Sequence, residues 1–361
     1  MWQRRVLVAV PCIAAVVWVW AVWPLTSTAR LVERTGLAGS VERTEALRRA
    51  AIWHPASVEA ANIRAGPSGP DGFQFLQTVT CDYIEKPLSG HSLKFACALG
   101  HNDIVKIKIG RANGEVHGEV AATRLLWALG FAADRMYPVR VDCRGCPARF
   151  DAERSPSTGL FDPAVIERPL GGAKRDDGLH WSWPDLDLVE ERAGGAPRAH
   201  RDALKLLAVF LQHTDNKPEQ QRLVCLDESP TAAPRCARPF LLLDDLGLTF
   251  GGANFINGNA AGSANFHAWS DLPIWKDTED CIGQLSRSFT GTLANPRVSE
   301  EGRRFLADLM IRLSQQQIRD LFEISRIDLR QTAGGAATID DWAHVFNRKR
   351  DEIVSRRCDD A

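Results

Sequence analysis

The segments from His213 to Gln220 and from Asp244 to Gly247 hold the residue types with the clearest chemical potential. They read H-T-D-N-K-P-E-Q and D-D-L-G, so each places carboxylates in polar text directly after an apolar run. A carboxylate on a rigidly held loop can orient a hydroxyl nucleophile, and Mg²⁺ prefers carboxylate and amide oxygens. We therefore expect Asp215 to orient an attacking hydroxyl, and Gln220 and Asp245 to hold a metal ion.

Lysines in two further places could offset phosphate charge. Lys217 follows the first of these carboxylates by two residues, within reach of a phosphoryl group in transfer. Lys106 and Lys108 belong to the run D-I-V-K-I-K-I-G, whose alternation predicts a strand with both lysines on one face. Glu115 and Glu119 come next, one turn apart on a predicted helix.

Together these segments resemble the catalytic loop and the metal-binding loop of the protein-kinase-like fold, H-R-D-x-K-x-x-N and D-F-G. Gln220 stands where that family has Asn, which keeps an amide oxygen but moves it outward by one methylene. The resemblance implies that Lys108 binds the α- and β-phosphates of ATP and that Glu119 positions it, with Lys106 as a second cofactor-binding lysine. The K-I-G text at Lys108 and its short distance to Glu119 are similar to the atypical branch, which includes HipA-like, phosphoinositide-kinase-like and secreted casein-kinase-like proteins.

The resemblance implies an α+β, two-lobed fold with a small mixed β/α lobe and a mostly helical large lobe, preceded by an N-terminal hydrophobic helix. We expect a signal peptide or membrane anchor over residues 1–29 and a juxtamembrane helical region with a linker over 30–72. The small lobe is expected over 73–150, and the large lobe, with a C-terminal helix, over 151–361.

Apolar patterning predicts the elements that must position the candidate residues. Alternating or apolar runs predict strands at 76–83, 93–99, 104–109, 136–143, 222–226 and 239–243. Helical periodicity predicts helices at 115–129, 200–212, 302–325 and 339–355. Val165–Arg168 is interpreted as the connection between the lobes, and residues 251–263 as a mobile loop in the activation-segment position. No G-x-G-x-x-G precedes the lysine strand, where Ser89–Ser92 forms the one glycine turn.

The N-terminal region predicts contact with a membrane. Residues 6–25 carry no charged side chain, and twenty such residues suffice to span the hydrocarbon core as a helix. Tryptophans near the end of this run and the small residues Ser27–Ala29 fit a membrane interface and a signal cleavage site, respectively. We expect a membrane-anchored or secreted protein whose body lies outside the cytoplasm. The alternative is a single-pass protein with a cytoplasmic body.

The cysteines favour export. Eight lie outside the apolar run, and an even number in an exported body predicts disulfide bonds. Cys225 and Cys236 flank a proline-containing turn and could staple a hairpin. Cys143 and Cys146 have the C-x-x-C spacing of thiol redox and metal sites, although a structural disulfide or two free thiols also fit.

Composition excludes other classes of protein. The chain has 361 residues, of which 45% are hydrophobic and 25% charged, and its formal net charge is −1. These values are ordinary for a globular protein and lack the basic excess of a general nucleic-acid binder, so no nucleic-acid partner is expected.

The sequence therefore predicts a kinase, that is, an ATP- and Mg²⁺-dependent phosphotransferase whose acceptor is a hydroxyl of a protein, sugar, lipid or small molecule. One alternative is a catalytically inactive kinase-like module that binds a nucleotide or a partner; Gln220 and the missing glycine-rich loop favour it. The other is an exported thiol redox or metal-binding protein that uses Cys143 and Cys146.

Overall fold

The computed structural model describes residues 41–69, 71–170, 180–225, 239–251, 263–330, 332 and 335–359. The expected signal peptide or membrane anchor at residues 1–29 lies outside these ranges. Within them, no helix combines the length and the apolar character that crossing a membrane requires. Residues from Arg43 onward form one compact unit.

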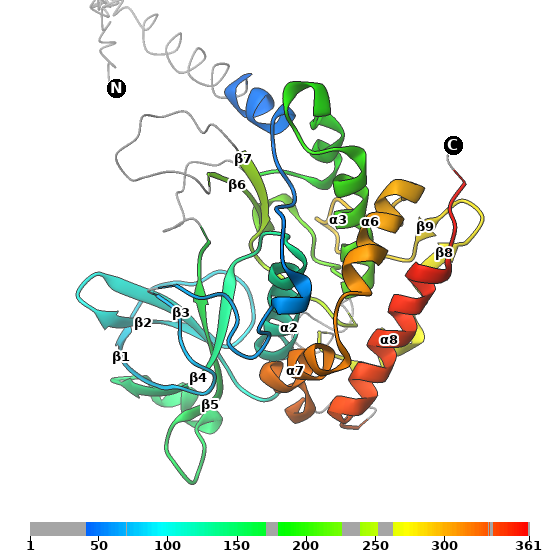
Figure 1. Cartoon of the computed structure of the whole chain (residues 1–361). Coiled ribbons are helices and arrows are strands. Elements are labelled where there is room, and N and C mark those ends of the chain that lie inside the picture. Colours follow the sequence, from blue (N-terminus) through cyan, green and yellow to red (C-terminus); the bar gives the residue numbers. More distant parts are fainter. Residues whose placement is uncertain are drawn as a thin grey trace, which may run out of the picture. The chain divides into compact units, whose positions relative to one another are not determined.

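A closed five-stranded barrel forms the first part of this unit (Figure 1). Around the barrel the strand order is β1-β2-β3-β5-β4, with β1 parallel to β4 and every other pair of neighbours antiparallel. The strands are β1 (Thr78–Ile84), β2 (Lys94–Gly100), β3 (Asp103–Ile109), β4 (Arg135–Arg144) and β5 (Phe161–Arg168). Alternate apolar side chains such as Phe95, Ile107 and Val139 fill the interior, so the opposite face of β3 is free to carry lysines.

Helix α2 (Gly114–Leu129) lies between the barrel and the helical part of the molecule (Figure 1). Its first turn is capped by Asn113, whose side chain accepts a hydrogen bond from the N–H of Glu115, and it ends at Gly130 in the left-handed conformation. All but one of its side chains are buried, because it packs on β4 on one side and on α7 on the other. A helix in this position can hold a carboxylate against the barrel.

The second part is mostly helical (Figure 1). Its α-helices are α3 (Arg198–Leu211), α5 (Phe266–Asp271), α6 (Glu300–Met310), α7 (Gln315–Ser325) and α8 (Ile339–Ser355). Its strands are β6 (Gln221–Cys225), β7 (Pro239–Leu243), β8 (Trp275–Asp277) and β9 (Ile282–Gly283). The short 3₁₀ turns of the whole unit are η1 (Val58–Ala60), η2 (Ala148–Glu153), η3 (Trp183–Leu188), η4 (Glu191–Ala193), η5 (Pro218–Gln220) and η6 (Ile327–Leu329). Packed aromatic rings, including Trp269, Phe322 and Trp342, form the centre of its core.

The mixed α+β architecture is confirmed, and most predicted elements occur within a few residues of their expected ends. The helix expected over 302–325 is two helices, because Ser314 begins a new one with a capping box to Gln317. Val165–Arg168 is not a connection between the lobes but the end of β5, which closes the barrel. The barrel therefore continues past the boundary expected at residue 150.

Residues 43–63 are not only a linker. Leu47, Ala50, Ile52 and Val58 are buried in the main core, and the N–H of Leu241 in β7 donates to the carbonyl of Ala51. This segment thus belongs to the folded body, although the sequence placed it in a juxtamembrane region. Of the loop expected over 251–263, residues 252–262 lie outside the described ranges.

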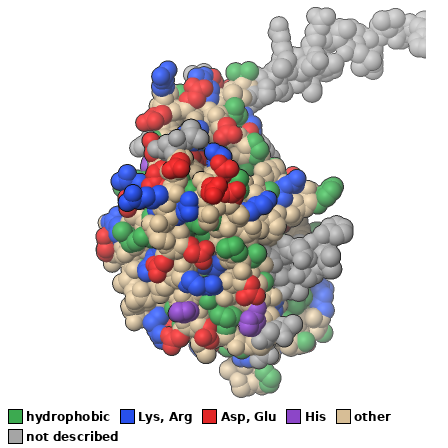
Figure 2. All heavy atoms as spheres, turned by 90° about the vertical axis from the view of Figure 1, so that its right-hand side faces the viewer, with side chains coloured by type: hydrophobic (Ala, Val, Ile, Leu, Met, Phe, Trp, Pro, Cys, Tyr) green, Lys and Arg blue, Asp and Glu red, His purple; other side chains and the backbone are tan. Residues whose placement is uncertain are grey.

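Three disulfide bonds are present among the described cysteines: Cys81–Cys97, Cys143–Cys146 and Cys281–Cys358. The C-x-x-C pair is therefore oxidised, with Cys143 in β4 and Cys146 just beyond the end of that strand. Cys236, and with it the expected Cys225–Cys236 staple, falls outside the described residues. The face of the helical part seen in Figure 2 carries acidic and basic side chains interspersed, without a large patch of one sign.

Candidate functional site

Lys108 lies at the junction of the barrel and helix α2. Strand alternation directs Ile107 and Ile109 into the barrel, and it directs Lys108 toward the helix, where its side chain is fully buried. The Nζ atom forms an ion pair with Glu119 and lies 3.1 Å from Oε2 of Glu115. Burial opposes the charge, but the surrounding carboxylates raise the pKa of Lys108 well above its ordinary value. The structure thus brings Lys108 and Glu119 together, as expected, and adds Glu115.

Asp245 reaches the same point from the other part of the molecule. It follows β7, its Oδ1 lies 4.0 Å from the Nζ of Lys108, and the same oxygen accepts the N–H of Gly247 at 3.0 Å. Burial opposes ionisation of Asp245, but Lys108, two further lysines and this N–H hold its pKa well below the usual range. The two lysines are Lys106 and Lys94, the latter facing Lys108 across β2 and β3. Asp245 is therefore a firmly ionised carboxylate at the mouth of the junction.

Glycines allow α2 to approach the Asp245 loop this closely. A Cβ atom on Gly247 would lie 2.7 Å from the Cγ of Glu115, and one on Gly118 would lie 3.3 Å from the hydroxyl of Thr249. Gly114 is equally constrained by Ser263. The glycine of the D-L-G segment is thus required by contact with Glu115, not by a positive φ.

Asp215 lies in the loop that follows α3 and is buried. Its Oδ2 accepts hydrogen bonds from the Nζ of Lys217 at 3.0 Å and from the Nε2 of Gln220 at 2.8 Å. Its Oδ1 accepts from the hydroxyl of Ser288 at 2.9 Å. Three donors from two segments therefore hold this carboxylate in a fixed orientation. A carboxylate that orients a nucleophile must be held in this way.

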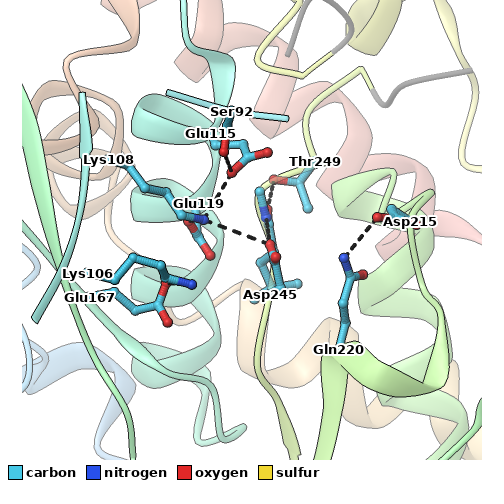
Figure 3. Close-up of polar contacts among 12 residues, drawn as sticks. Ser92, Lys106, Lys108, Glu115, Glu119, Glu167, Asp215, Gln220, Asp245 and Thr249 are labelled. Carbon is cyan, nitrogen blue, oxygen red and sulfur yellow. Dashed lines mark hydrogen bonds and ion pairs between the residues drawn. The ribbon is translucent and has the colours of Figure 1, made fainter. Parts of the chain in front are cut away.

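The β6–β7 hairpin explains why the two loops meet. Gln220 directly precedes β6 and Asp244 directly follows β7, so the antiparallel register places both at one end of the hairpin. The N–H of Asp244 donates to the carbonyl of Gln220 at 2.8 Å. Figure 3 shows the result, with Asp245 between the Lys108–Glu119 pair and the Asp215–Gln220 pair.

His213 is a buried residue at the start of this loop. It is fully buried, and burial lowers its pKa to about 4, so the ring is neutral near pH 7. Neither ring nitrogen has a hydrogen-bond partner within the described ranges, and the ring packs near Trp183 with centroids 6.3 Å apart. A neutral, apolar-packed imidazole serves here as a core residue beneath Asp215.

Lys106 contacts a different carboxylate from those that contact Lys108. Its Nζ forms an ion pair with Glu167 of β5, its register partner. Behind this pair, the carboxylates of Glu167, Asp134 and Asp244 cluster in the interior, where Arg222 contacts both aspartates. Burial, and then Asp244, raise the pKa of Asp134 well above its ordinary value. Sequence reasoning missed this buried acid cluster, because its members lie just before β4, in β5 and just after β7 and share no motif.

The turn between β1 and β2 is tied to the Lys108 site. The hydroxyl of Ser92 donates to Oε2 of Glu115 at 2.8 Å, and the amide of Asn113 donates to the carbonyl of Leu93 at 3.2 Å. Hydrogen bonds to the start of α2 thus hold the glycine turn that occupies the place of a glycine-rich loop.

The oxygen atoms at the junction fit a hard divalent cation such as Mg²⁺. Asp245 offers an ionised, partly exposed carboxylate. The Oε1 atom of Gln220 is buried without a hydrogen-bond partner among the described residues, while its Nε2 is held by Asp215. A carboxylate and an amide oxygen with spare lone pairs are ligands that Mg²⁺ accepts.

A cavity of about 580 Å³ opens on the barrel beside the Lys106–Glu167 ion pair. Its wall includes the turn after β1 and parts of β3 and β5, with Ser89, Ala96, Lys106 and Glu167 among the lining residues. Lys108, Asp215 and Asp245 do not line it. This volume is in the range of pockets that bury a small organic ligand.

Comparisons with known proteins give little further information. No protein-family model matches the chain, and no curated protein matches it. Among solved structures, the chain is similar to the Helicobacter pylori proinflammatory kinase CtkA, with 10% sequence identity and a TM-score of 0.40. The matched region covers 78% of this chain and 95% of that one. A likeness at this level identifies no family, so the site is interpreted from its own geometry.

Proposed function

We propose that the chain is an atypical kinase-like phosphotransferase that moves the γ-phosphoryl group of ATP, in the presence of Mg²⁺, to a hydroxyl acceptor. The observation that carries the proposal is the position of Lys108, whose Nζ is paired with Glu119 of α2 and lies 4.0 Å from Asp245. A strand lysine, a helix glutamate and a loop aspartate at one point form the arrangement that phosphoryl transfer uses to hold nucleotide phosphates and metal.

Each side chain has a distinct part in this proposal. Lys108 binds the α- and β-phosphates, and Glu119 keeps its ammonium group in place. Asp245 and Gln220 hold Mg²⁺, which when bound neutralises phosphate charge and aligns the transferred group. Asp215 accepts a hydrogen bond from the acceptor hydroxyl, and Lys217, 3.0 Å from Asp215, offsets charge on the group in transfer.

The cavity beside Lys106 is the proposed location of the nucleoside. It adjoins the lysine strand, and its wall combines the apolar Leu88 and Ala96 with the Lys106–Glu167 ion pair. A base in this cavity would place the phosphates along β3 toward Lys108.

A catalytically inactive, nucleotide-binding module is the second candidate. Two observations favour it: Lys108 already contacts two carboxylates, and the Gln220 amide is engaged by Asp215. The thiol redox alternative has less support, since Cys143 is disulfide-bonded to Cys146 and only 6% exposed. The disulfides support the proposal that the body works in an oxidising compartment outside the cytoplasm.

The decisive experiment measures binding and turnover on the same samples. The thermal unfolding temperature of the full chain is measured with ATP, with and without Mg²⁺. In parallel, transfer of labelled γ-phosphate is measured to serine and threonine peptides, sugars and phosphoinositide vesicles. We compare the wild type with Asp215→Asn, with Asp82→Asn as the control at an exposed aspartate. Mg²⁺-dependent stabilisation with transfer that Asp215→Asn reduces at least about 100-fold supports the kinase. Stabilisation without transfer supports the inactive module. The absence of both stabilisation and transfer rejects both candidate functions.

A further inference from the structure

Ser288 occupies the position that an acceptor hydroxyl needs. Its Oγ donates a hydrogen bond to Oδ1 of Asp215 at 2.9 Å. The other carboxylate oxygen, Oδ2, already accepts from Lys217 and Gln220. If Asp215 orients the nucleophile, Oδ1 is the atom that does so, and in this structure a hydroxyl of the same chain is bound to it.

The turn that carries Ser288 is firmly attached to the Asp215 loop. The N–H of Ser288 donates to the carbonyl of Thr214 at 2.8 Å. The buried amide of Asn216 accepts from the N–H groups of Thr292 and Leu293, both at 2.8 Å, and donates to the carbonyl of Leu293 at 3.0 Å. A Cβ on Gly291 would lie 2.8 Å from the Oδ1 of Asn216, so glycine permits this docking. The hydroxyl of Ser288 is therefore pre-positioned on Asp215.

Resting on the function proposed above, we propose that Ser288 is a modification site: the chain phosphorylates its own Ser288, using Asp215 as the base. The ligand class at this site is a nucleoside triphosphate that donates its γ-phosphoryl group to a serine hydroxyl in cis. An external acceptor must displace Ser288 from Oδ1 or share that oxygen with it.

The chemical step is balanced without any further reagent. The Oγ of Ser288 attacks the γ-phosphorus, and a new O–P bond forms. The bond from the γ-phosphorus to the β,γ-bridging oxygen breaks, and its electron pair leaves with ADP. The hydroxyl proton passes to Oδ1 of Asp215 and from there to water. The product places a phosphate of about −1.5 to −2 charge beside a carboxylate, so it weakens the contact between Ser288 and Asp215.

Two neighbouring hydroxyls provide an internal comparison. Ser286 and Thr290 lie two residues before and two residues after Ser288, and both side chains are exposed. In the described part of the chain neither forms a hydrogen bond with Asp215, whereas Ser288 does. Modification by proximity to Asp215 must select Ser288, while a contaminating kinase would favour the exposed neighbours.

The test is site-resolved mass spectrometry of the full chain after incubation with Mg²⁺ and ATP. We expect phosphate on Ser288 in the wild type and in the control Ser286→Ala, and none on Ser288 in Asp215→Asn. Ser288→Thr should accept phosphate on the threonine, which shows that the position and not the serine is selected. The first-order rate constant of Ser288 phosphorylation should not change with protein concentration, because the acceptor belongs to the same chain.

Two outcomes would overturn the inference while leaving the proposed function intact. One is transfer to an external hydroxyl with Ser288 unmodified, which makes Ser288 only a positioning residue. The other is phosphate on Ser286 or Thr290 at the level of Ser288. Absence of all nucleotide turnover rejects the proposed function together with this inference. Circular dichroism of Asp215→Asn establishes that loss of modification in that variant is not loss of fold.

Discussion

The main chain of Gln220 is hydrogen-bonded to that of Asp244, from the N–H of Asp244 to the carbonyl of Gln220 at 2.8 Å. This contact at the end of the β6–β7 hairpin joins the loop of Asp215 to the loop of Asp245, together with the hydrogen bond from the N–H of Thr214 to the carbonyl of Leu248 at 3.3 Å. The Gln220 side chain extends the connection, because its Nε2 donates to Asp215. Gln220 therefore connects the two halves of the candidate site through both its main chain and its side chain.

Substitution of Gln220 should affect the metal dependence more than the fold. Gln220→Ala removes the donor to Asp215 and the buried Oε1 atom, so we expect a higher Mg²⁺ concentration for half-maximal phosphate transfer and a fall in kcat of about tenfold or more. Titration of transfer against Mg²⁺ measures both. Glu219→Ala, at an exposed position of the same turn, is the control and should leave the titration unchanged. Equal Mg²⁺ dependence in the two variants would show that Gln220 is not a ligand.

Removal of the Lys108 ammonium should destabilise the protein as well as abolish nucleotide binding. In Lys108→Met the carboxylates of Glu119 and Glu115 lose their counter-ion, and breaking a buried pair typically costs about 3–5 kcal/mol. The double variant Lys108→Met/Glu119→Gln should recover part of the loss, because one unpaired charge is gone. Urea unfolding with all three proteins measures the coupling. Strictly additive effects would contradict the pairing seen here.

The glycine of the D-L-G segment gives a steric prediction. Gly247→Ala places a methyl group 2.7 Å from the Cγ of Glu115, so α2 or the loop must shift. We expect a loss of about 1–3 kcal/mol in unfolding free energy, together with weaker ATP binding. Gly100→Ala is the matched control, since its Cβ meets no atom within 4 Å. A similar, small effect of both substitutions would mean that the contact between Gly247 and Glu115 is easily relieved.

Local patterning in this chain was enough to predict most of the barrel strands, and the resemblance to the protein-kinase-like fold implied the Lys108–Glu119 contact. Alternation in D-I-V-K-I-K-I placed Lys108 opposite the barrel interior, and helical periodicity placed Glu119 on the next element. Both inferences use short-range geometry, in which a side chain's direction follows from its position in one element. The convergence of Asp215 and Asp245 was also implied by the resemblance. In the structure the β6–β7 hairpin brings their loops together, because Gln220 precedes β6 and Asp244 follows β7.

Long-range contacts were not accessible in this way. Ser288 lies 73 residues from Asp215, and no pattern in R-S-F-T-G marks it. Likewise, Glu167 and Asp134 are close only because β5 pairs with β4 and β3. Residues 43–63 enter the core only because Ala51 pairs with the start of β7. Such contacts depend on tertiary packing, and a single sequence contains no local signal for them.

The free energy of unfolding should decrease as the pH is lowered, because of His117. This side chain is fully buried in α2, and burial lowers its pKa from the ordinary 6.5 to about 4. The unfolded chain therefore binds a proton below pH 6.5 while the folded chain does not, so stability is complete above about pH 6.5 and is lost as the pH falls toward 4. The difference between the two pKa values corresponds to about 3 kcal/mol of unfolding free energy.

The variant His117→Gln isolates this contribution. Glutamine keeps a donor for the carbonyl of Ser325, which lies 3.0 Å from Nδ1 of His117, but it does not titrate. Urea midpoints between pH 7.5 and 4.5 should converge for the two proteins as the pH falls. Parallel curves would exclude His117 as a source of acid sensitivity.

Removal of individual disulfide bonds should distinguish a structural role of these cysteines from a redox role. Cys281–Cys358 closes a loop of 77 residues and ties the segment after α8 to the residue before β9, whereas Cys143–Cys146 closes a loop of only three. Because loop-closure entropy grows with loop length, loss of the first bond should cost roughly 4 kcal/mol and loss of the second roughly 2 kcal/mol. Paired alanine substitutions followed by urea unfolding measure these costs. Phosphate transfer should persist in Cys143→Ala/Cys146→Ala, since neither sulfur touches Lys108, Asp215 or Asp245. Loss of phosphate transfer in this variant, with the fold intact, would show that the C-x-x-C pair is required for the activity.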